Sequence, residues 1–346
     1  MDRRTSLKIS AMGLGTLATG LAFEGPAEAA PGPPQPRVGR ENQIGRPVRV
    51  VSVGFHPGRP LNEIVELVDR AGAQGTDIIS IPETCRGLDA TSGETLEGPT
   101  VTAMARLARK HSTYIVCPID RRTDGQRHNS AVLLDRSGKI VCIYDKIYPV
   151  WQGECVQKPP VLPGRNVQVY PTDFGRVGFG ICFDVNWGEL WEQLSNERAE
   201  LVIWPSAYSA GTSLQARAIN YNYYIVSATW VPDCHVFDLD GAQLVYDKCN
   251  QDQHTNVTRV TLDLDRCIFH QDLNLAPDKL PRLLKERGDD VEREKWLAME
   301  GWFVLKAKRP GVSCRALARQ YGLEELRHYL NRSQCEIDKC RGWEFS

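Results

Sequence analysis

The chain has 346 residues, of which 42% are hydrophobic and 25% are charged. This is enough to form one large α/β domain with an appendage, or two small domains, and it excludes a disulfide-stapled miniprotein, a disordered tail and a collagen-like chain. The formal net charge is −1, so the chain lacks the overall basic charge that attracts nucleic acids or anionic membranes.

The first residues have the pattern of an export signal. The paired arginines Arg3-Arg4 precede an apolar run from Ile9 to Phe23, and Ala27-Glu28-Ala29 has the small-x-small spacing of a cleavage site. Paired arginines and a glycine-diluted apolar run are typical of a twin-arginine signal. We therefore expect residues 1–29 to be removed on export to a periplasmic or other extracytoplasmic location, and residues 30–46 to form a Pro-rich linker. No apolar run reaches about 18 residues, so no permanent membrane span is expected.

Strands and helices are predicted to alternate along residues 47–275, which we expect to form one domain. Short β-branched or apolar runs predict strands, and apolar residues at helical spacing predict helices. The predicted strands are 48–53, 77–81, 114–117, 131–134, 140–144, 177–181, 201–204, 223–229 and 257–262, and the predicted helices are 61–71, 101–108, a helix from about 189, and 212–222. Turn signals at 135–138 and at Asp240-Gly241 predict hairpins. The pattern indicates an α/β layered domain with a mixed sheet.

From about Ala276 the sequence becomes rich in charge, and residues 276–346 are expected to be a helical C-terminal extension. Its predicted helices are 278–287, 291–308 and 314–331. The extension could cover the domain or serve as an interaction arm. A glycine-containing break at Tyr321-Gly322 resembles a helix-turn-helix, which leaves an interaction protein acting through its tail as an alternative. Nucleic acid is not an expected partner, because the charge is near neutral and the leader directs the chain out of the cytoplasm.

The eleven cysteines all lie after residue 84, and no C-x-x-C pair occurs. Their spacing makes only a weak case for zinc, so no metal site is expected, and the cysteines are expected to be buried or disulfide-bonded with unassigned partners. No phosphate-binding loop of the Walker type occurs, and no organic cofactor is implied.

Three chemically useful side chains follow predicted strands directly. Glu83 follows the strand at 77–81, Lys146 the strand at 140–144, and Cys182 the strand at 177–181. Functional sites of open α/β sheets form at the carboxyl ends of strands. Cys182 could act as a nucleophile, Lys146 could lower its pKa and stabilise a negative oxygen, and Glu83 could accept and return the proton. Taken singly, each residue more often has a structural role: a lysine at a strand end is usually a solvated charge, a glutamate after proline usually a cap, and a cysteine between apolar residues usually part of the core.

These positions lie in segments that resemble the nitrilase (carbon–nitrogen hydrolase) superfamily. Ile81-Pro82-Glu83 resembles its first motif, Tyr144-Asp145-Lys146 the second, and the run from Ile181 to Leu190 the third. Trp204-Pro205-Ser206-Ala207 and Ala216-Arg217-Ala218-Ile219 are similar to the segments that follow in the family. The resemblance extends from residue 48 to about 265.

The resemblance implies a four-layer α-β-β-α sandwich and a set of catalytic roles. Glu83 would be the general base, Lys146 the cationic stabiliser and Cys182 the nucleophile. Glu154, eight residues after Lys146, matches a second glutamate of the amidase branches and would orient Lys146 and the substrate. The backbone N–H of Phe183 would be the second oxyanion donor.

Other positions are assigned more loosely. Asp184 is expected to be a structural hydrogen-bond acceptor, and Trp151, Trp187 and Tyr208 could line a substrate pocket or pack in the core. The sequence departs from the family pattern in two places. Asn220-Tyr221 stands where an acidic residue and an asparagine are usual, and Gly188 stands where a proline is usual. The first departure puts in doubt a family ion-pair or hydrogen-bond contact around the predicted helix at 212–222, and neither departure touches the three catalytic positions.

The resemblance and the export signal together therefore predict an exported amidohydrolase that cleaves a linear amide or an N-carbamoyl compound through a cysteine thioester, with a small-molecule substrate and a homo-oligomeric assembly. A nitrilase and an N-acyltransferase of the same superfamily remain alternatives, as does an inactive relative.

Overall fold

The computed structural model describes residues 42–88, 91–153, 155–157, 159–249, 254–272 and 278–342. The predicted export signal at residues 1–29, most of the expected linker and Glu154 lie outside these residues. The expected boundaries of the linker, domain and extension stay predictions, as does the homo-oligomer.

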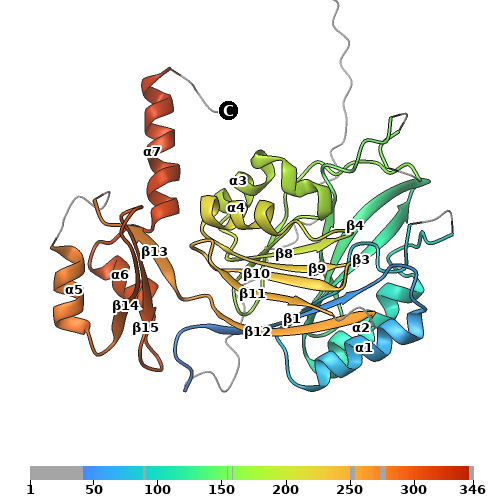
Figure 1. The fold of residues 1–346 in the computed structure, drawn as a ribbon, viewed down its shortest axis with the longest axis horizontal. Helices are drawn as coiled ribbons and strands as arrows, with labels where there is room; N and C mark the ends of the chain where they lie inside the picture. The colour runs from blue at the N-terminus through green and yellow to red at the C-terminus, as the bar shows by residue number, and fades with distance from the viewer. Residues whose placement is uncertain are drawn as a thin grey trace, which may run out of the picture. The chain divides into compact units, whose positions relative to one another are not determined.

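The first sheet has six strands in the order β12-β1-β2-β3-β4-β5. The bounds are β12 (Thr255–Asp263), β1 (Pro47–Phe55), β2 (Ile78–Ser80), β3 (Tyr114–Thr123), β4 (Gln126–Leu134) and β5 (Ile140–Asp145). Strands β1, β2 and β3 are parallel, and the other neighbours are antiparallel. Helices α1 (Leu61–Ala73) and α2 (Pro99–His111) cover one face of this sheet (Figure 1).

Side-chain alternation explains how this sheet is buried on both faces. In β1, Val51, Val53 and Phe55 pack with α1 and α2, whereas Val48 and Val50 belong to the core shared with the second sheet. Because successive side chains of a strand point to opposite faces, a strand between two layers must be apolar at both sets of positions. This is why the run at 48–53 is almost continuously apolar.

The second sheet has the order β11-β10-β9-β8-β7-β6. The bounds are β11 (Gln243–Lys248), β10 (Asp233–Phe237), β9 (Tyr224–Thr229), β8 (Leu201–Ser206), β7 (Arg176–Phe179) and β6 (Val169–Pro171). Helices α3 (Gly188–Asn196) and α4 (Gly211–Tyr221) cover its outer face (Figure 1). The layers therefore run helix, sheet, sheet, helix, and the predicted four-layer sandwich is confirmed.

The C-terminal extension differs in part from its prediction. Helices α5 (Lys279–Arg287), α6 (Cys314–Gln320) and α7 (Leu326–Cys340) are present, and the long helix expected at 314–331 is divided between α6 and α7. The helix predicted at 291–308 is wrong: these residues form the hairpin of β14 (Val291–Leu297) and β15 (Trp302–Ala307).

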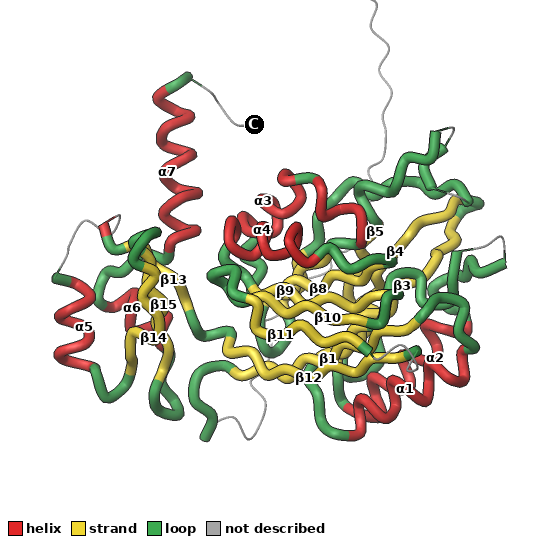
Figure 2. The backbone as a smooth tube through the Cα atoms, viewed as in Figure 1, coloured by secondary structure: helices red, strands yellow, loops and turns green. Residues whose placement is uncertain are grey.

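The hairpin forms because it pairs with a strand that the sequence did not suggest. β15 hydrogen-bonds to β13 (Cys267–His270), giving a third sheet in the order β13-β15-β14. Phe303 and Leu305 alternate into a small core with Phe269, Leu283 and Cys314. Figure 2 shows these three strands as a group separate from the two larger sheets. The strand predicted at 257–262 corresponds to β12, and it is not the last strand because β13, β14 and β15 follow it in the chain.

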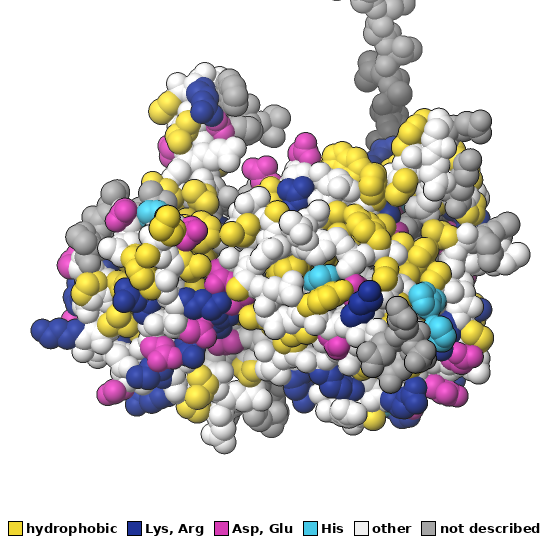
Figure 3. Space-filling model, viewed as in Figure 1, with side chains coloured by type: hydrophobic (Ala, Val, Ile, Leu, Met, Phe, Trp, Pro, Cys, Tyr) yellow, Lys and Arg dark blue, Asp and Glu magenta, His cyan; other side chains and the backbone are white. Residues whose placement is uncertain are grey.

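Three surface and covalent features complete the description. All eleven cysteines lie among the described residues, and each has a free thiol. None of the described helices is long and apolar enough to cross a bilayer. On the face drawn in Figure 3, basic and acidic side chains are interspersed, as the near-zero net charge leads one to expect.

Candidate active site

The ends of three strands from both sheets bring the predicted catalytic side chains to one place. Glu83 follows β2, Lys146 follows β5 and Cys182 follows β7. All three are buried, with exposed fractions of 2% for Glu83, 2% for Lys146 and 5% for Cys182. A carboxyl, an ammonium and a thiol therefore share a site from which most water is excluded.

Glu83 is held by hydrogen bonds from four parts of the chain. Its Oε1 accepts from Lys146 Nζ at 2.8 Å and from Asn129 Nδ2 at 2.6 Å. Its Oε2 accepts from the backbone N–H of Ala207 at 2.8 Å, and its backbone carbonyl accepts from Trp230 Nε1 at 2.6 Å. These donors fix the position of the carboxylate. Because each carboxylate oxygen has two lone pairs, the group can still accept a proton.

Lys146 is surrounded by acidic groups. Burial alone would lower the pKa of its ammonium, but the charges of Glu83 and Asp184 and the hydrogen bond to Glu83 raise this pKa above its usual value. Lys146 is therefore protonated at neutral pH, and it can donate a hydrogen bond to a developing negative oxygen but cannot act as a base.

Cys182 sits at a sharp turn between β7 and the short 3-10 helix η1 (Cys182–Asn186). Its φ is +48°, a left-handed conformation that costs a non-glycine residue roughly 1–3 kcal/mol and is concentrated at functional sites. Trp204 Nε1 on β8 donates to the Cys182 carbonyl at 3.1 Å and holds this turn in place. A strand-to-helix turn of this kind presents a nucleophile clear of its own backbone.

The thiol of Cys182 is less acidic than the sequence led us to expect. Burial and the negative charge of Glu83 raise the pKa of Cys182 to about 12, outweighing the opposite effects of Lys146, the Ala207 N–H and the Ser206 hydroxyl. Lys146 does lower the pKa of Cys182, as expected, but burial and Glu83 raise it by more. The thiol is protonated at neutral pH, and a nucleophilic attack requires a base to remove its proton.

Asp184 makes the contacts of a structural acceptor. Its Oδ2 accepts from the Tyr144 hydroxyl at 2.6 Å and from the Ile181 N–H at 2.8 Å, and its Oδ1 accepts from the Tyr148 N–H at 2.8 Å. These bonds join the ends of β5 and β7, which are the strands that precede Lys146 and Cys182.

Phe183 lies in the first turn of η1, where backbone N–H groups have no partner within the helix and can face an anion.

Aromatic side chains contact one another on the segments that follow Lys146 and Cys182. Trp187 stacks on Tyr148 with ring centroids 4.5 Å apart and meets Phe183 edge-on at 5.0 Å. Tyr208 meets the Trp204 ring edge-on at 5.7 Å, and burial raises the pKa of its hydroxyl. Trp151 is instead 64% exposed, and it is outside the core.

Helix α4 supports the loop after the thiol despite its departures from the family pattern. Arg217 Nε donates to the Val185 carbonyl at 3.0 Å. The Tyr221 hydroxyl donates to the Gly188 carbonyl at 3.2 Å. Two of the residues that depart from the family pattern, Tyr221 and Gly188, thus contact each other.

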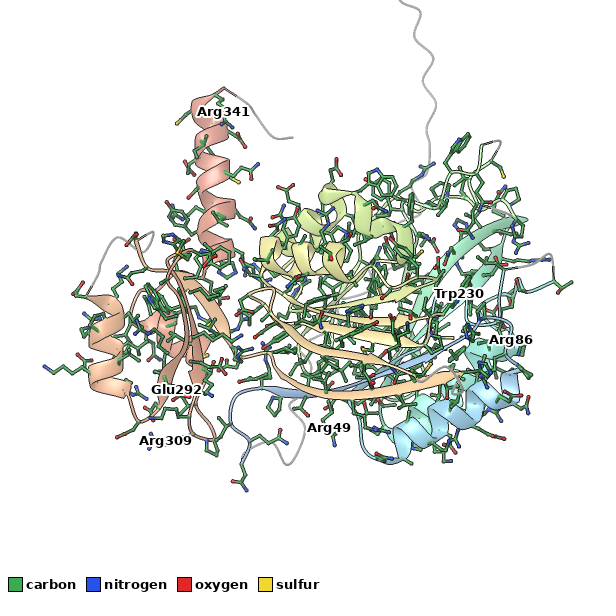
Figure 4. The ribbon with its side chains drawn as sticks, in the orientation of Figure 1. Arg49, Arg86, Trp230, Glu292, Arg309 and Arg341 are labelled. Atoms are coloured by element: carbon green, nitrogen blue, oxygen red, sulfur yellow. The ribbon has the colours of Figure 1, made fainter. Side chains whose placement is uncertain are left out.

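Two neighbours of Glu83 were absent from the sequence-based candidates. Asn129 lies on β4, in an unremarkable polar stretch, and Trp230 lies in the loop between β9 and β10. Trp230 and Arg86, which follows Glu83 by three residues, are labelled in Figure 4 at the same side of the sandwich. No local motif marks Asn129 or Trp230, because each contacts Glu83 only after segments that are distant in the sequence have folded together. Among the described residues, no group of three or more His, Cys, Asp or Glu side chains is arranged to hold a metal ion.

The comparison with known families accounts for this arrangement. The family model described as carbon-nitrogen hydrolase matches residues 58–268. The chain belongs to the carbon–nitrogen hydrolase family, within the nitrilase superfamily. The match contains Glu83, Lys146 and Cys182 and ends within β13, so the whole C-terminal extension at residues 276–346 lies outside it.

Similar proteins agree with this assignment at low identity. The carbon–nitrogen hydrolase chain is 28% identical over 204 residues to deaminated glutathione amidase of Synechocystis, covering 51% of this chain and 72% of that protein. It is 26% identical over 200 residues to the nitrilase and fragile histidine triad fusion protein of Drosophila melanogaster, covering 49% of this chain and 41% of that protein. The chain thus spans less than half of the fusion protein's length.

Solved structures share the fold of this carbon–nitrogen hydrolase. An amidase from Nesterenkonia superposes with a TM-score of 0.55 and 20% identity, and the match covers 63% of this chain and 91% of the amidase. At this identity the likeness concerns the fold alone.

Proposed function

We propose that the protein is an exported amidohydrolase that cleaves the carbon–nitrogen bond of a linear amide or an N-carbamoyl compound through a thioester at Cys182. The observation that carries the proposal is the Glu83–Lys146 contact of 2.8 Å beside a buried thiol that interacts with both charges. Such a trio supplies a base, an oxyanion stabiliser and a nucleophile without histidine or a cofactor.

The acylation half-reaction follows from these contacts. Cys182 Sγ attacks the carbonyl carbon of the substrate as Glu83 takes the thiol proton, which the raised pKa of Cys182 makes necessary. The negative oxygen of the tetrahedral intermediate is stabilised by Lys146 Nζ and the Phe183 N–H. The intermediate collapses to a thioester, and the carbon–nitrogen bond breaks as Glu83 returns the proton to the departing amine.

Deacylation repeats the same steps with water. Glu83 takes a proton from a water molecule as its oxygen attacks the thioester carbonyl, and Lys146 again stabilises the oxyanion. The carbon–sulfur bond breaks, the carboxylic product leaves, and the proton on Glu83 restores the Cys182 thiol. Glu154 is proposed to orient Lys146 and the substrate, and Phe183, Trp187 and Tyr208 to line the acyl pocket.

Relatives favour an amide over a nitrile. One similar protein is named deaminated glutathione amidase. A variant of the structurally similar Nesterenkonia amidase has the acetamide moiety of fluoroacetamide covalently added at its active-site cysteine. Cys182, at the end of β7, is the corresponding residue that we propose for this chain.

The test is product analysis with matched variants. The purified protein is incubated with linear amides, N-carbamoyl amino acids and nitriles, and ammonia release is measured together with the intact mass. We expect release from an amide or carbamoyl compound and an acyl adduct mapped to Cys182. Cys182→Ala should lose both signals, Glu83→Gln should lose about 10²- to 10⁴-fold in rate, and Cys340→Ala, on α7, should retain full activity.

Two results would overturn the proposal: hydrolysis that persists in Cys182→Ala, or ammonia released only from nitriles. Expression of the full chain in a bacterium with a twin-arginine pathway tests export. The expected product is a periplasmic protein that lacks residues 1–29, and a full-length cytoplasmic protein would contradict export.

A further inference from the structure

A cavity whose lining includes none of the three catalytic side chains lies between the start of β8 and helices α6 and α7. Its volume is about 520 Å³. Its lining is dominated by six arginines, namely Arg46, Arg176, Arg198, Arg315, Arg319 and Arg327. Only three carboxylates, Glu200, Asp265 and Glu325, line the same space. The cavity therefore has an excess of positive charge in a chain whose total charge is near zero.

The three carboxylates are already engaged. Glu200 pairs with Arg46, and Glu325 Oε2 accepts from Arg315 Nη1 at 2.8 Å. Asp265 accepts from the Ser313 hydroxyl and from the Cys314 N–H, each at 2.6 Å. The ion pairs found among the described residues include none formed by Arg198, Arg319 or Arg327.

Arg327 is the most unusual of these arginines because it is buried. Its exposed fraction is 6%, and its Nη1 donates to the Ala199 carbonyl at 2.5 Å. Burial and then the like charge of Arg315 lower the pKa of Arg327 to about 10. An arginine stays charged at neutral pH even so, which leaves a buried cation with a carbonyl but no carboxylate as its partner.

A second donor at the cavity is also unsatisfied. Arg315 Nε is buried and has no hydrogen-bond partner, although its Nη atoms contact Glu325 and the Arg266 carbonyl. Buried charges in proteins are normally paired, because an uncompensated one costs several kcal/mol. Among the described residues, Arg327 therefore has no carboxylate partner and Arg315 Nε has no acceptor, although Glu325 pairs with the other end of the Arg315 guanidinium.

We propose that this cavity binds a small oxyanion with two or more negative charges, either a phosphate compound or a polycarboxylate. Guanidinium groups match the planar spacing of phosphate and carboxylate oxygens and bind them bidentately. Arg327 lies at the buried end of the site, and the exposed Arg198 and Arg319 lie at its rim. The cavity is within the usual size range of small-molecule sites, about 300–1,000 Å³.

The bound anion would join the sandwich to the C-terminal extension. Arg198 and Glu200 lie just before β8, whereas Arg315 and Arg319 belong to α6 and Arg327 to α7. A ligand that contacts both parts stabilises the folded arrangement in proportion to its occupancy. The site is separate from the proposed thioester chemistry, so it stands or falls independently of the hydrolase activity.

The test is calorimetric titration of the full purified chain in a chloride buffer with three probes: inorganic phosphate, pyrophosphate and citrate. We expect one site with a dissociation constant below about 1 mM for at least one probe, accompanied by a rise in the thermal unfolding midpoint. Binding of the phosphates alone identifies a phosphate site, and binding of citrate alone identifies a polycarboxylate site.

Matched variants localise the binding. Arg327→Gln could prevent folding, so the rim is changed instead: the double variant Arg198→Gln, Arg319→Gln should weaken binding at least about tenfold, because each arginine contributes a charge-assisted hydrogen bond. Arg106→Gln, an exposed arginine on α2, should leave the affinity unchanged. The proposal is overturned if no probe binds up to about 10 mM, or if the rim variant and the α2 variant bind with the same affinity.

Discussion

The ionisation state of the Cys182 thiol depends on burial and on two neighbouring charges of opposite sign, Glu83 and Lys146. Lys146 is close enough to favour the thiolate, but burial and Glu83 act in the opposite direction and prevail. The sequence indicated that a cation lies beside the cysteine, but it could not weigh that cation against burial. The resting protein is therefore expected to hold a thiol, with Glu83 in place to remove its proton during attack.

This leads to a prediction about alkylation. With the pKa of Cys182 raised to about 12, the thiolate fraction should rise about tenfold for each pH unit between pH 7 and 10. The rate of carboxamidomethylation of Cys182 by iodoacetamide, measured by peptide mass spectrometry, should rise over this whole range. A short cysteine peptide, whose thiol titrates near ~8.5, should level off within it. A plateau for Cys182 near pH 8 would contradict the burial argument.

The residues of the candidate site differ in how visible they were in the sequence. Glu83, Lys146 and Cys182 each end a strand and fall within recognisable motifs, so their convergence was predictable. Asn129 was not, because its contact with Glu83 depends on the register of β4 against β3, in which it pairs with Asp120. Register is a property of the folded sheet, and nothing in the residues around Asn129 specifies it.

At the scale of elements, the sandwich was predictable and the hairpin was not. Strand β1 and helix α1 have clear periods of apolar residues, and both formed close to their expected bounds. The segment 291–297 contains Glu, Arg and Lys, which favour helices, yet it forms β14. Pairing with β15 overrides this propensity, because the β15 side chains complete a core that neither segment could form alone.

The turn of this hairpin gives a test of its backbone. Gly301 has a φ of +66°, so Gly301→Ala should destabilise the protein by about 1 kcal/mol because alanine disfavours left-handed backbone. Asparagine tolerates this conformation better, and both substitutions place a Cβ equally near the His270 ring, at 3.3 Å. Gly301→Asn should therefore cost clearly less in urea unfolding. Equal losses would show that contact with His270, and not φ, determines the effect.

At the scale of the whole chain, a buried ion cluster links the second sheet to the C-terminal extension. Asp238, just after β10, is 1% exposed in its side chain and pairs with Arg266 at 2.6 Å and with Lys295 at 2.7 Å. Arg266 immediately precedes β13, and Lys295 lies on β14. Their charges and hydrogen bonds outweigh burial and lower the pKa of Asp238 below its usual value. The extension is thus attached through charges that must remain paired.

Asp238→Asn should consequently destabilise the protein by roughly 1.5–3 kcal/mol at pH 7, because it removes the buried carboxylate that accepts charged hydrogen bonds from Arg266 and Lys295, although these two keep Glu294 and Asp240 as partners. The matched surface change Glu292→Gln, at the residue labelled in Figure 4, removes a half-exposed pair with Lys306 and should cost at most about 1 kcal/mol. A carboxyl whose pKa is lowered by folding contributes stability above its unfolded pKa, near ~3.9, and loses it as the pH falls through the folded value. The difference between wild type and Asp238→Asn, measured by urea unfolding from pH 7 to pH 3, should therefore be constant above about pH 5 and shrink below pH 4. A difference that does not change with pH, or one no larger than that of Glu292→Gln, would mean that the extension is attached by its apolar contacts instead.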